Sequence, residues 1–251
     1  MVDQPVIETQ KLTKNFGALR AVSIVDLKVY PGQIHSIIGP NGAGKTTLFN
    51  LLTGSFPPTS GRIIFKEKEI TGFPPHKVSK LGIGRSYQIV NIFPELSVLE
   101  NVRIAIQSRT KINYHFLSSF RKLGFLEEKA REMLIRIGLK GKENILAKNL
   151  SHGEKRILDI SVGLATEPSL LLLDEPASGL SENEKLIVTG LIHEIVNPIT
   201  IILIEHNIDV VLNMSDRITV LNQGSVIAEG LPEEIQKNEK VQEAYLGEEL
   251  T

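Results

Sequence analysis

The chain has 251 residues, with 28 basic side chains, 29 acidic ones and no cysteine. This balance excludes a global positive field that would recruit nucleic acid, and the lack of cysteine excludes disulfides and thiolate sites. The N-terminal sequence lacks the basic start and apolar run of a signal peptide, and the apolar runs are far shorter than the roughly 18 residues of a membrane span. We therefore expect a soluble protein that reaches a membrane only through a partner.

The N-terminal part of the chain alternates short β-branched stretches with turn residues. Residues 5–35 are expected to form strands and turns, and "QIHSIIGP" (33–40) a buried strand that ends in a glycine-rich loop. "KTTLFNLLTG" (45–54) has helical spacing and a glycine stop, whereas residues 60–82 indicate a hairpin followed by a short helix. Residues 98–150 follow a mainly helical pattern.

Two apolar runs end in charged residues, "SLLLLDEP" (169–176) and "TIILIEH" (200–206). Such runs are typical of parallel strands that are buried on both faces. Between them, "SENEKLIVTGLIHEI" (181–195) predicts a crossover helix. This alternation predicts an α/β fold with a mostly parallel sheet.

A phosphate-binding motif, "GPNGAGKT" (39–46), lies between a predicted strand and a predicted helix. Its glycines let backbone N–H groups face the phosphates, and the helix N-terminus favours an anion. Lys45 is expected to bridge the β- and γ-phosphates of ATP, and the Thr46 hydroxyl to hold Mg²⁺. A glycine-rich turn without a ligand is the alternative. The predicted ATP-binding residues of this segment are Gly39, Pro40, Asn41, Gly42, Ala43, Gly44, Lys45, Thr46 and Thr47.

Asp174 and Glu175 follow a predicted buried strand at the end where ligands gather in parallel sheets. Asp174 suits a Mg²⁺-linked carboxylate, and Glu175 is placed to orient or deprotonate an attacking water. The alternative is a helix N-cap with an acid in the first turn. Together with the phosphate-binding motif, the pair favours phosphoryl transfer to water.

Five motifs in this order resemble the ATP-binding subunit of ABC transporters, and the resemblance covers nearly the whole chain. They are "GPNGAGKT", "SYQIVNIFPELSVLENV" (86–102), "LSHGE" (150–154), "LLLLDEP" and "LIEH". The resemblance implies a P-loop NTPase core with a mostly parallel sheet, an N-terminal antiparallel β part and a helical subdomain. Within one domain over residues 1–251, residues 1–86 and 163–251 would form mainly the core. Residues 87–162 would form mainly the helical subdomain that carries the signature motif.

The resemblance also implies roles for single residues. Gln88 would reach Mg²⁺ or the lytic water, His206 would contact the γ-phosphate beside Glu175, and Phe16 would stack on adenine. Phe16 stands where tyrosine is common, but stacking requires only the ring. The alternatives are a solvated loop glutamine, a structural histidine and a core phenylalanine.

The neighbours Ser151 and His152 could suggest a hydrolytic site, but no "GxSxG" elbow surrounds the serine. In the resemblance, "LSHGE" stands for the signature "LSGGQ", so that Ser151, His152, Gly153 and Glu154 face ATP held by a second subunit. The Ser151 hydroxyl and the Gly153 backbone would bind its γ-phosphate, and His152 would be tolerated if its side chain points away. The signature is thus half of a site, and a dimer is expected. Ser181 departs from the aspartate that commonly ends the neighbouring D-loop.

At subfamily level, "YQIVNIFPELSVLENV", residues 104–125 and "VQEAYLGEE" (241–249) are similar to ATPases of branched-chain amino acid uptake and of the related urea and amide uptake. The resemblance implies ATP and Mg²⁺ as cofactors. The implied partners are a second, identical or different, ATPase subunit, permease subunits and indirectly a solute-binding protein, at the cytoplasmic face of the cell membrane. No nucleic acid is expected. The alternatives are a soluble ABC ATPase and a P-loop kinase, but the chain has one P-loop, no long coiled-coil insertion, and motifs that a kinase leaves unexplained.

Overall fold

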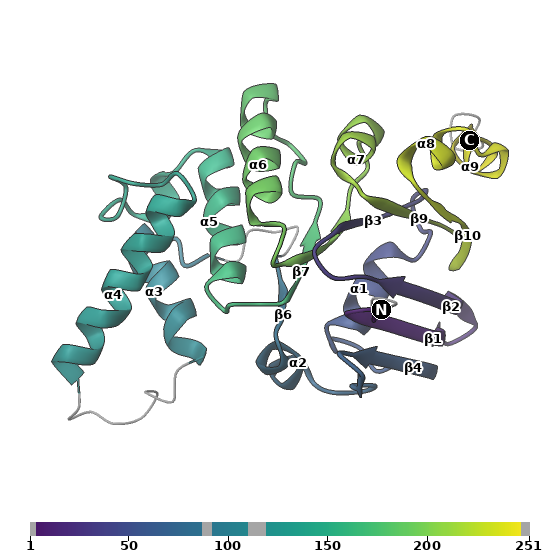
Figure 1. Cartoon of the computed structure of the whole chain (residues 1–251), viewed down its shortest axis with the longest axis horizontal. Helices are drawn as coiled ribbons and strands as arrows, with labels where there is room; N and C mark the ends of the chain where they lie inside the picture. Colours follow the sequence, from purple (N-terminus) through teal and green to yellow (C-terminus); the bar gives the residue numbers. More distant parts are fainter. Residues whose placement is uncertain (1–3, 87–91, 110–118, 247–251) are drawn as a thin grey trace.

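The computed structural model describes residues 4–86, 92–109 and 119–246, which form two β-sheets and a set of helices (Figure 1). The strands are β1 (Ile7–Phe16), β2 (Leu19–Val29), β3 (Ile34–Ile38), β4 (Ser60–Phe65), β5 (Lys68–Glu69), β6 (Ile83–Arg85), β7 (Leu170–Asp174), β8 (Thr200–Ile204), β9 (Arg217–Asn222) and β10 (Ser225–Gly230). The helices are α1 (Lys45–Leu52), α2 (Pro75–Leu81), α3 (Val98–Arg109), α4 (Ser119–Arg136), α5 (His152–Leu164), α6 (Glu182–Ile195), α7 (Ile208–Met214), α8 (Pro232–Gln236) and α9 (Glu239–Leu246).

The larger sheet has the strand order β10-β9-β3-β8-β7-β6, and all its neighbouring strands run parallel except the β9–β10 pair. The smaller sheet, β2-β1-β4-β5, is antiparallel. The predicted α/β class with a mostly parallel sheet and an N-terminal antiparallel part is therefore confirmed. The predicted crossover helix between residues 169–176 and 200–206 is α6.

Strand β7 shows why the apolar runs of the sequence lack alternation. Leu171 and Leu173 pack into a cluster with buried residues of α3, α4, α5 and α6. Leu170 and Leu172 point to the other face, where they pack with α1 and the antiparallel sheet. Successive side chains of a strand face opposite sides, so a sheet covered on both faces requires apolar residues at every position.

Helices α3, α4 and α5 lie at one end of the molecule, away from the antiparallel sheet (Figure 1). Residues 87–162 contain α3, α4 and most of α5, which continues to Leu164. The division of the chain at these positions stays a prediction. Among the described residues, none of the helices is long and apolar enough to cross a membrane.

His35 is fully buried in β3, where its Nε2 lies 2.7 Å from the Thr219 hydroxyl. Burial, with a smaller contribution from Arg217, lowers the pKa of His35 from 6.5 to about 3. Between about pH 6.5 and pH 3, His35 is therefore protonated in the unfolded chain but neutral in the folded chain. The free energy of unfolding falls as pH drops below about 6.5.

Between about pH 7.5 and pH 5, His35 is expected to account for a loss of about 2 kcal/mol in the free energy of unfolding. The variant His35→Gln removes this titration, so its stability should depend on pH less steeply by that amount. Urea denaturation at both pH values measures the difference. The exposed His193 provides the control variant His193→Gln, which should keep the slope of the parent protein.

Candidate nucleotide-binding site

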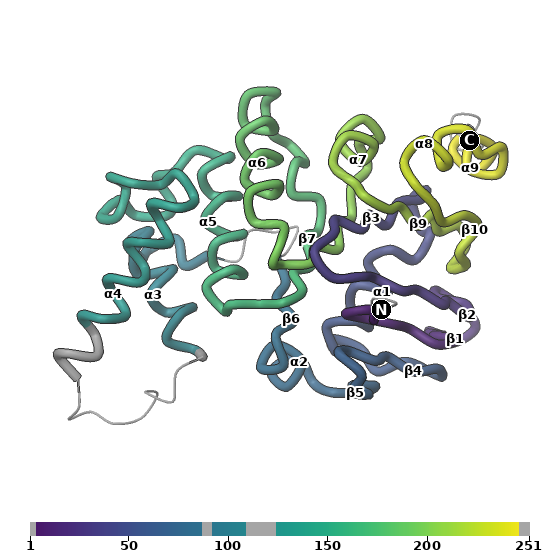
Figure 2. Tube along the Cα trace, viewed as in Figure 1, coloured from purple at the N-terminus to yellow at the C-terminus, as the bar shows by residue number. Residues whose placement is uncertain are grey.

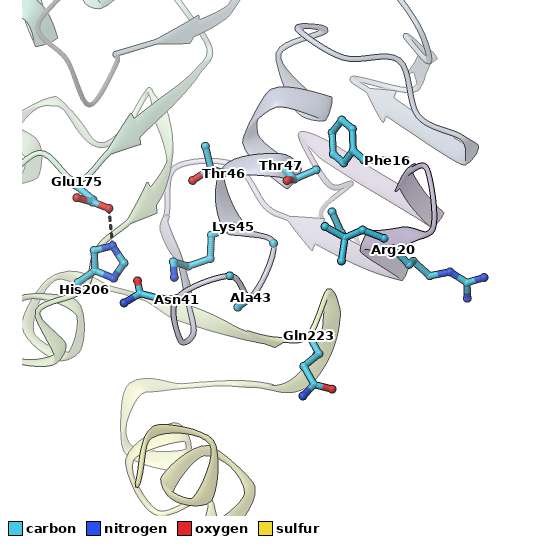
Figure 3. A pocket seen from close by; sticks show the side chains of 14 residues that line it. Phe16, Arg20, Asn41, Ala43, Lys45, Thr46, Thr47, Glu175, His206 and Gln223 are labelled. Atoms are coloured by element: carbon cyan, nitrogen blue, oxygen red, sulfur yellow. Dashed lines mark hydrogen bonds and ion pairs between the residues drawn. The ribbon is translucent and has the colours of Figure 1, made fainter. Parts of the chain in front are cut away.

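A cavity with a volume of about 830 Å³ lies against the loop between β3 and α1 (Figure 3). It gathers side chains from the antiparallel sheet, the β3–α1 loop and the ends of β7 and β8. Its lining residues are Phe16, Leu19, Arg20, Ala21, Asn41, Gly42, Ala43, Gly44, Lys45, Thr46, Thr47, Glu175, His206 and Gln223.

The predicted strand, glycine-rich loop and helix are present as β3, residues 39–44 and α1. Two positions of the loop require glycine. A Cβ at Gly39 would lie 2.0 Å from the Leu221 carbonyl oxygen, and one at Gly44 would lie 2.3 Å from that of Ala21. Both glycines also have positive φ angles. The loop therefore packs closely against β2 and β9, and this packing restricts its backbone conformation.

Lys45, the first residue of α1, is buried although it carries a charge. Its Nζ donates hydrogen bonds to the carbonyl oxygens of Gly39 at 2.6 Å and Pro40 at 2.9 Å. Thr46 and Thr47 line the cavity beside it (Figure 3). The first turn of α1 therefore presents an ammonium group, hydroxyls and the positive end of the helix dipole to the cavity.

Glu175 and His206 face one another at the ends of β7 and β8, and Glu175 Oε1 lies 2.5 Å from His206 Nε2 (Figure 3). The Glu175 side chain is only 12% exposed, whereas that of His206 is 47% exposed. Glu175 adopts a φ of +49°, which is rare for residues other than glycine. Backbone strain of this kind persists only where the surroundings impose it.

The backbone on either side of Glu175 is contacted by Arg156 of α5, which is 5% exposed. Its Nη2 donates to the carbonyl oxygen of Asp174 at 2.7 Å and to that of Glu175, and its Nε donates to the carbonyl oxygen of Pro176 at 3.1 Å. Sequence reasoning missed Arg156. A charged residue on the apolar face of an amphipathic helix is the signal that could have identified it.

Glu205 is a second residue that the sequence reasoning passed over. It is 3% exposed, and its carboxylate accepts hydrogen bonds from the amides of Ala177 at 2.8 Å and His206 at 3.2 Å. Burial raises the pKa of Glu205, and the amide hydrogen bonds oppose this shift. The Glu205 side chain therefore links the backbone of Ala177, which follows Glu175, to the backbone of His206, whose side chain contacts Glu175.

Asp174 precedes Glu175 but does not line the cavity. Its Oδ2 lies 3.3 Å from Nη2 of Arg85, whose Nη1 donates to Asn50 Oδ1 at 2.6 Å. Burial raises the pKa of the Asp174 carboxyl, with a further contribution from Glu175, whereas Arg85 lowers it. A cation close to the Asp174 and Glu175 carboxylates would reduce the free-energy cost of burying their negative charge.

The residues predicted to hold Mg²⁺ suit this ion by donor type, because carboxylate and hydroxyl oxygens are ligands that Mg²⁺ takes. Thr46 lines the cavity and Asp174 lies at the end of β7. No group of three or more His, Cys, Asp or Glu side chains among the described residues could form an all-protein metal cage. This arrangement fits an ion shared between one or two side chains and substrate phosphates. Gln88 lies outside the described residues.

Phe16 ends β1 at the rim of the cavity and is 43% exposed, so it is not a core residue. Its ring meets Phe56 edge to face, with the centroids 5.6 Å apart, and the Lys14 ammonium lies 5.1 Å from the Phe16 centroid. The ring is thereby oriented while one surface faces the cavity.

The signature residues lie away from this cavity, at the start of α5. Ser151 is the N-cap: its hydroxyl accepts a hydrogen bond from the Glu154 amide at 3.2 Å, and Glu154 accepts one from the Ser151 amide at 3.0 Å. Ser151 and His152 are exposed. The structure therefore gathers the P-loop, Glu175, His206 and Phe16, and leaves the signature outside their cavity.

Comparisons with known proteins agree with this geometry. Residues 22–178 match the family model of the ABC transporter, and residues 225–251 match that of the branched-chain amino acid ATP-binding cassette transporter. The high-affinity branched-chain amino acid transport ATP-binding protein LivG of Escherichia coli K12 is 41% identical, over 98% of this chain and 100% of that protein. BraF of Pseudomonas aeruginosa, which carries the same description, is 40% identical over the same shares.

The fold comparison points the same way. A crystal structure of a nucleotide-free ATP-binding cassette from an ABC transporter superposes with a TM-score of 0.86 at 32% identity, covering 96% of this chain and 99% of that one. The family model over residues 22–178 includes the phosphate-binding loop, the start of α5 and Glu175. The chain belongs to the ABC transporter family, as one of its ATP-hydrolysing subunits.

Proposed function

We propose that the chain binds ATP with Mg²⁺ and hydrolyses it to drive uptake of a small solute, with branched-chain amino acids as the solute class. The observation that carries the hydrolytic part is the Glu175–His206 pair, which lines the same cavity as the phosphate-binding loop. A carboxylate and an imidazole that contact each other beside a phosphate site suit the activation of a water molecule.

The nucleotide is proposed to span the cavity from Phe16 to α1. Adenine stacks on the exposed ring of Phe16, and the phosphates receive the backbone N–H groups of residues 39–47. The Lys45 ammonium exchanges its two carbonyl partners for the β- and γ-phosphates, because a charged acceptor forms the stronger hydrogen bonds. Thr46 and Asp174 hold Mg²⁺, and Gln88 is proposed to reach the same region.

In the hydrolytic step, Glu175 accepts a proton from the water that attacks the γ-phosphate. His206 holds the carboxylate in place at 2.5 Å and faces the phosphate with its other edge. Arg156 and Glu205 do not touch the substrate, but they fix the backbone on either side of the pair. When bound, Mg²⁺ supplies positive charge to the phosphate oxygens and so stabilises the charge that develops there.

A second subunit is proposed to complete each site. Ser151 and His152 are exposed at the start of α5, and neither lines the cavity of its own chain. The Ser151 hydroxyl and the Gly153 amide at a helix N-terminus are suited to bind an anion. In a dimer they bind the γ-phosphate of the ATP held by the partner, so that ATP stabilises the closed dimer and hydrolysis lets it open.

The names of the relatives, which describe branched-chain amino acid transport, support this solute class. The chain is proposed to lie at the cytoplasmic face of the cell membrane, bound to permease subunits that receive solute from a binding protein. Co-purification from membranes tests this part. Polytopic membrane proteins are expected to accompany the chain, and their absence from an intact complex would favour a soluble ABC ATPase.

Ser151→Ala is expected to weaken ATP-dependent dimerisation and hydrolysis at least tenfold while the monomer still binds ATP. The variant also removes the N-cap of α5, which costs about 1 kcal/mol of stability. Ser97→Ala is a matched control, because the Ser97 hydroxyl accepts a hydrogen bond from the Glu100 amide at the start of α3. Titration of nucleotide binding and sedimentation distinguish the two effects. If Ser151→Ala abolished ATP binding by the monomer, the placement of Ser151 would be wrong.

A further inference from the structure

The amide that is proposed to bind the partner's γ-phosphate already has an anionic partner within its own chain. The Gly153 N–H donates to Oε1 of Glu184 at 2.9 Å. Glu184 belongs to the first turn of α6, which packs beside α5; Figure 2 shows their traces side by side. A side-chain carboxylate therefore occupies the position that a phosphate oxygen requires.

Glu184 is held in this position by the start of its own helix. Its Oε2 accepts hydrogen bonds from the Ser181 hydroxyl at 2.7 Å and from the Ser181 amide at 3.1 Å. These hydrogen bonds, first that of the Ser181 hydroxyl and then that of the Gly153 amide, lower the pKa of the Glu184 carboxyl. The group therefore remains an anion at neutral pH and repels a second anion at the same amide.

The fit between Glu184 and Gly153 is close. A Cβ at Gly153 would lie 2.8 Å from Cγ of Glu184, so a larger residue would push the carboxylate away from the amide. His152 lies on the same side of α5: its Nε2 is 3.6 Å from the position of a Cβ on Gly179, in the loop before α6. His152 thus points toward this loop and toward the Glu184 carboxylate, whose charge it favours.

We propose that Glu184 acts as an internal anion that occupies the Gly153 amide in the separate subunit and must release it before the γ-phosphate of a partner's ATP can bind there. The inference rests on the proposed role of the signature in the ATP-bound dimer. The Ser151 hydroxyl acts as acceptor in its own helix cap and so retains its hydrogen for donation to the phosphate. Glu184 therefore controls one of the two donors, and its release sets the ATP concentration at which the dimer closes.

The variant Glu184→Gln tests this competition. Glutamine preserves the size of the side chain but has a single, neutral acceptor oxygen. When that oxygen accepts from Ser181, the NH₂ group faces the Gly153 N–H and cannot accept its hydrogen bond. Hydrogen bonds to charged groups are roughly twice as strong as neutral ones, so the competitor becomes weaker. In a Glu175→Gln background, the ATP concentration for half-maximal dimerisation should fall roughly fivefold to tenfold. Sedimentation velocity over an ATP titration measures it.

Glu182→Gln in the same background is the matched control. Glu182 lies in the same first turn of α6, but its carboxylate pairs with Lys185 at 2.7 Å and is exposed. This variant removes an equal charge from the same surface. It should leave the ATP concentration for half-maximal dimerisation within about twofold of the Glu175→Gln background. A similar fall in both variants would show that net charge, not occupation of the Gly153 amide, sets the midpoint, and would overturn the inference.

The remaining outcomes separate the inference from the function on which it rests. If the Glu175→Gln protein binds ATP but never dimerises, the proposed sandwich fails before Glu184 is tested. If it dimerises and Glu184→Gln leaves the midpoint unchanged, the sandwich stands and the competition is refuted. If Glu184→Gln raises the midpoint, Glu184 organises the signature for phosphate instead of competing with it, and the inference is again wrong.

Discussion

Glu175→Gln should reduce ATP hydrolysis by about 10²-fold to 10⁴-fold, the range that general base catalysis contributes. Glutamine fills the same space and keeps a polar contact with His206, but it cannot accept the proton of the attacking water. Nucleotide binding should change little, because the phosphate-binding loop and Phe16 are untouched. With ATP present and hydrolysis blocked, the closed dimer should accumulate. Phosphate release measures the first effect, and sedimentation the second.

Glu167→Gln is a control that shares two properties with this variant. Glu167 also adopts a positive φ, of +48°, and it also loses a charge on substitution, but it lies at the surface near Lys129. Its hydrolysis rate should stay within about twofold of the parent. Hydrolysis by Glu175→Gln within tenfold of the parent would refute the assignment of Glu175 as the base, whatever the state of the dimer.

Much of the fold was predictable because its signals are local. The P-loop spacing, the unbroken apolar runs of β7 and β8 and the helical period of α6 each depend on residues close in sequence. The same holds for Asp174 and Glu175, whose position at the end of a buried strand places them at the carboxyl-terminal edge of the parallel strands. The resemblance in motif order added Phe16, His206 and the signature, and the structure places Phe16 and His206 at one cavity.

The residues that support the site were not predictable in the same way. Arg85, Arg156 and Glu184 act through partners that are 89, 18 and 31 residues away in sequence, at Asp174 and Gly153. The Arg85 contact exists because β6 pairs with β7, and the other two exist because α5 packs on β7 and α6 packs on α5. No local pattern reports such a packing. A charged residue within an apolar helix face shows that a buried partner must exist, but it does not identify the partner.

The largest structural effect is expected at Arg156. Arg156→Lys keeps a positive charge, yet a lysine ammonium cannot reproduce the planar fork that bridges the carbonyl oxygens of residues 174–176. At least one buried carbonyl loses its partner, which costs about 1–3 kcal/mol of stability. Glu175 then loses a group that holds its unusual backbone conformation. Because a shift of about 1 Å in a catalytic group can cost about a hundredfold in rate, kcat for ATP should fall by about that factor.

The comparison of kcat with KM separates positioning from general damage. Arg156 does not line the cavity of the phosphate-binding loop, so the KM for ATP should stay within about threefold while kcat falls. Arg103→Lys is the control, since Arg103 on α3 pairs with Glu100 at 2.7 Å near the surface. Its kcat and stability should match the parent. A folded Arg156→Lys protein that loses stability but keeps its kcat would show that the strained conformation of Glu175 is held without Arg156, and that the link from α5 to the catalytic carboxylate is structural only.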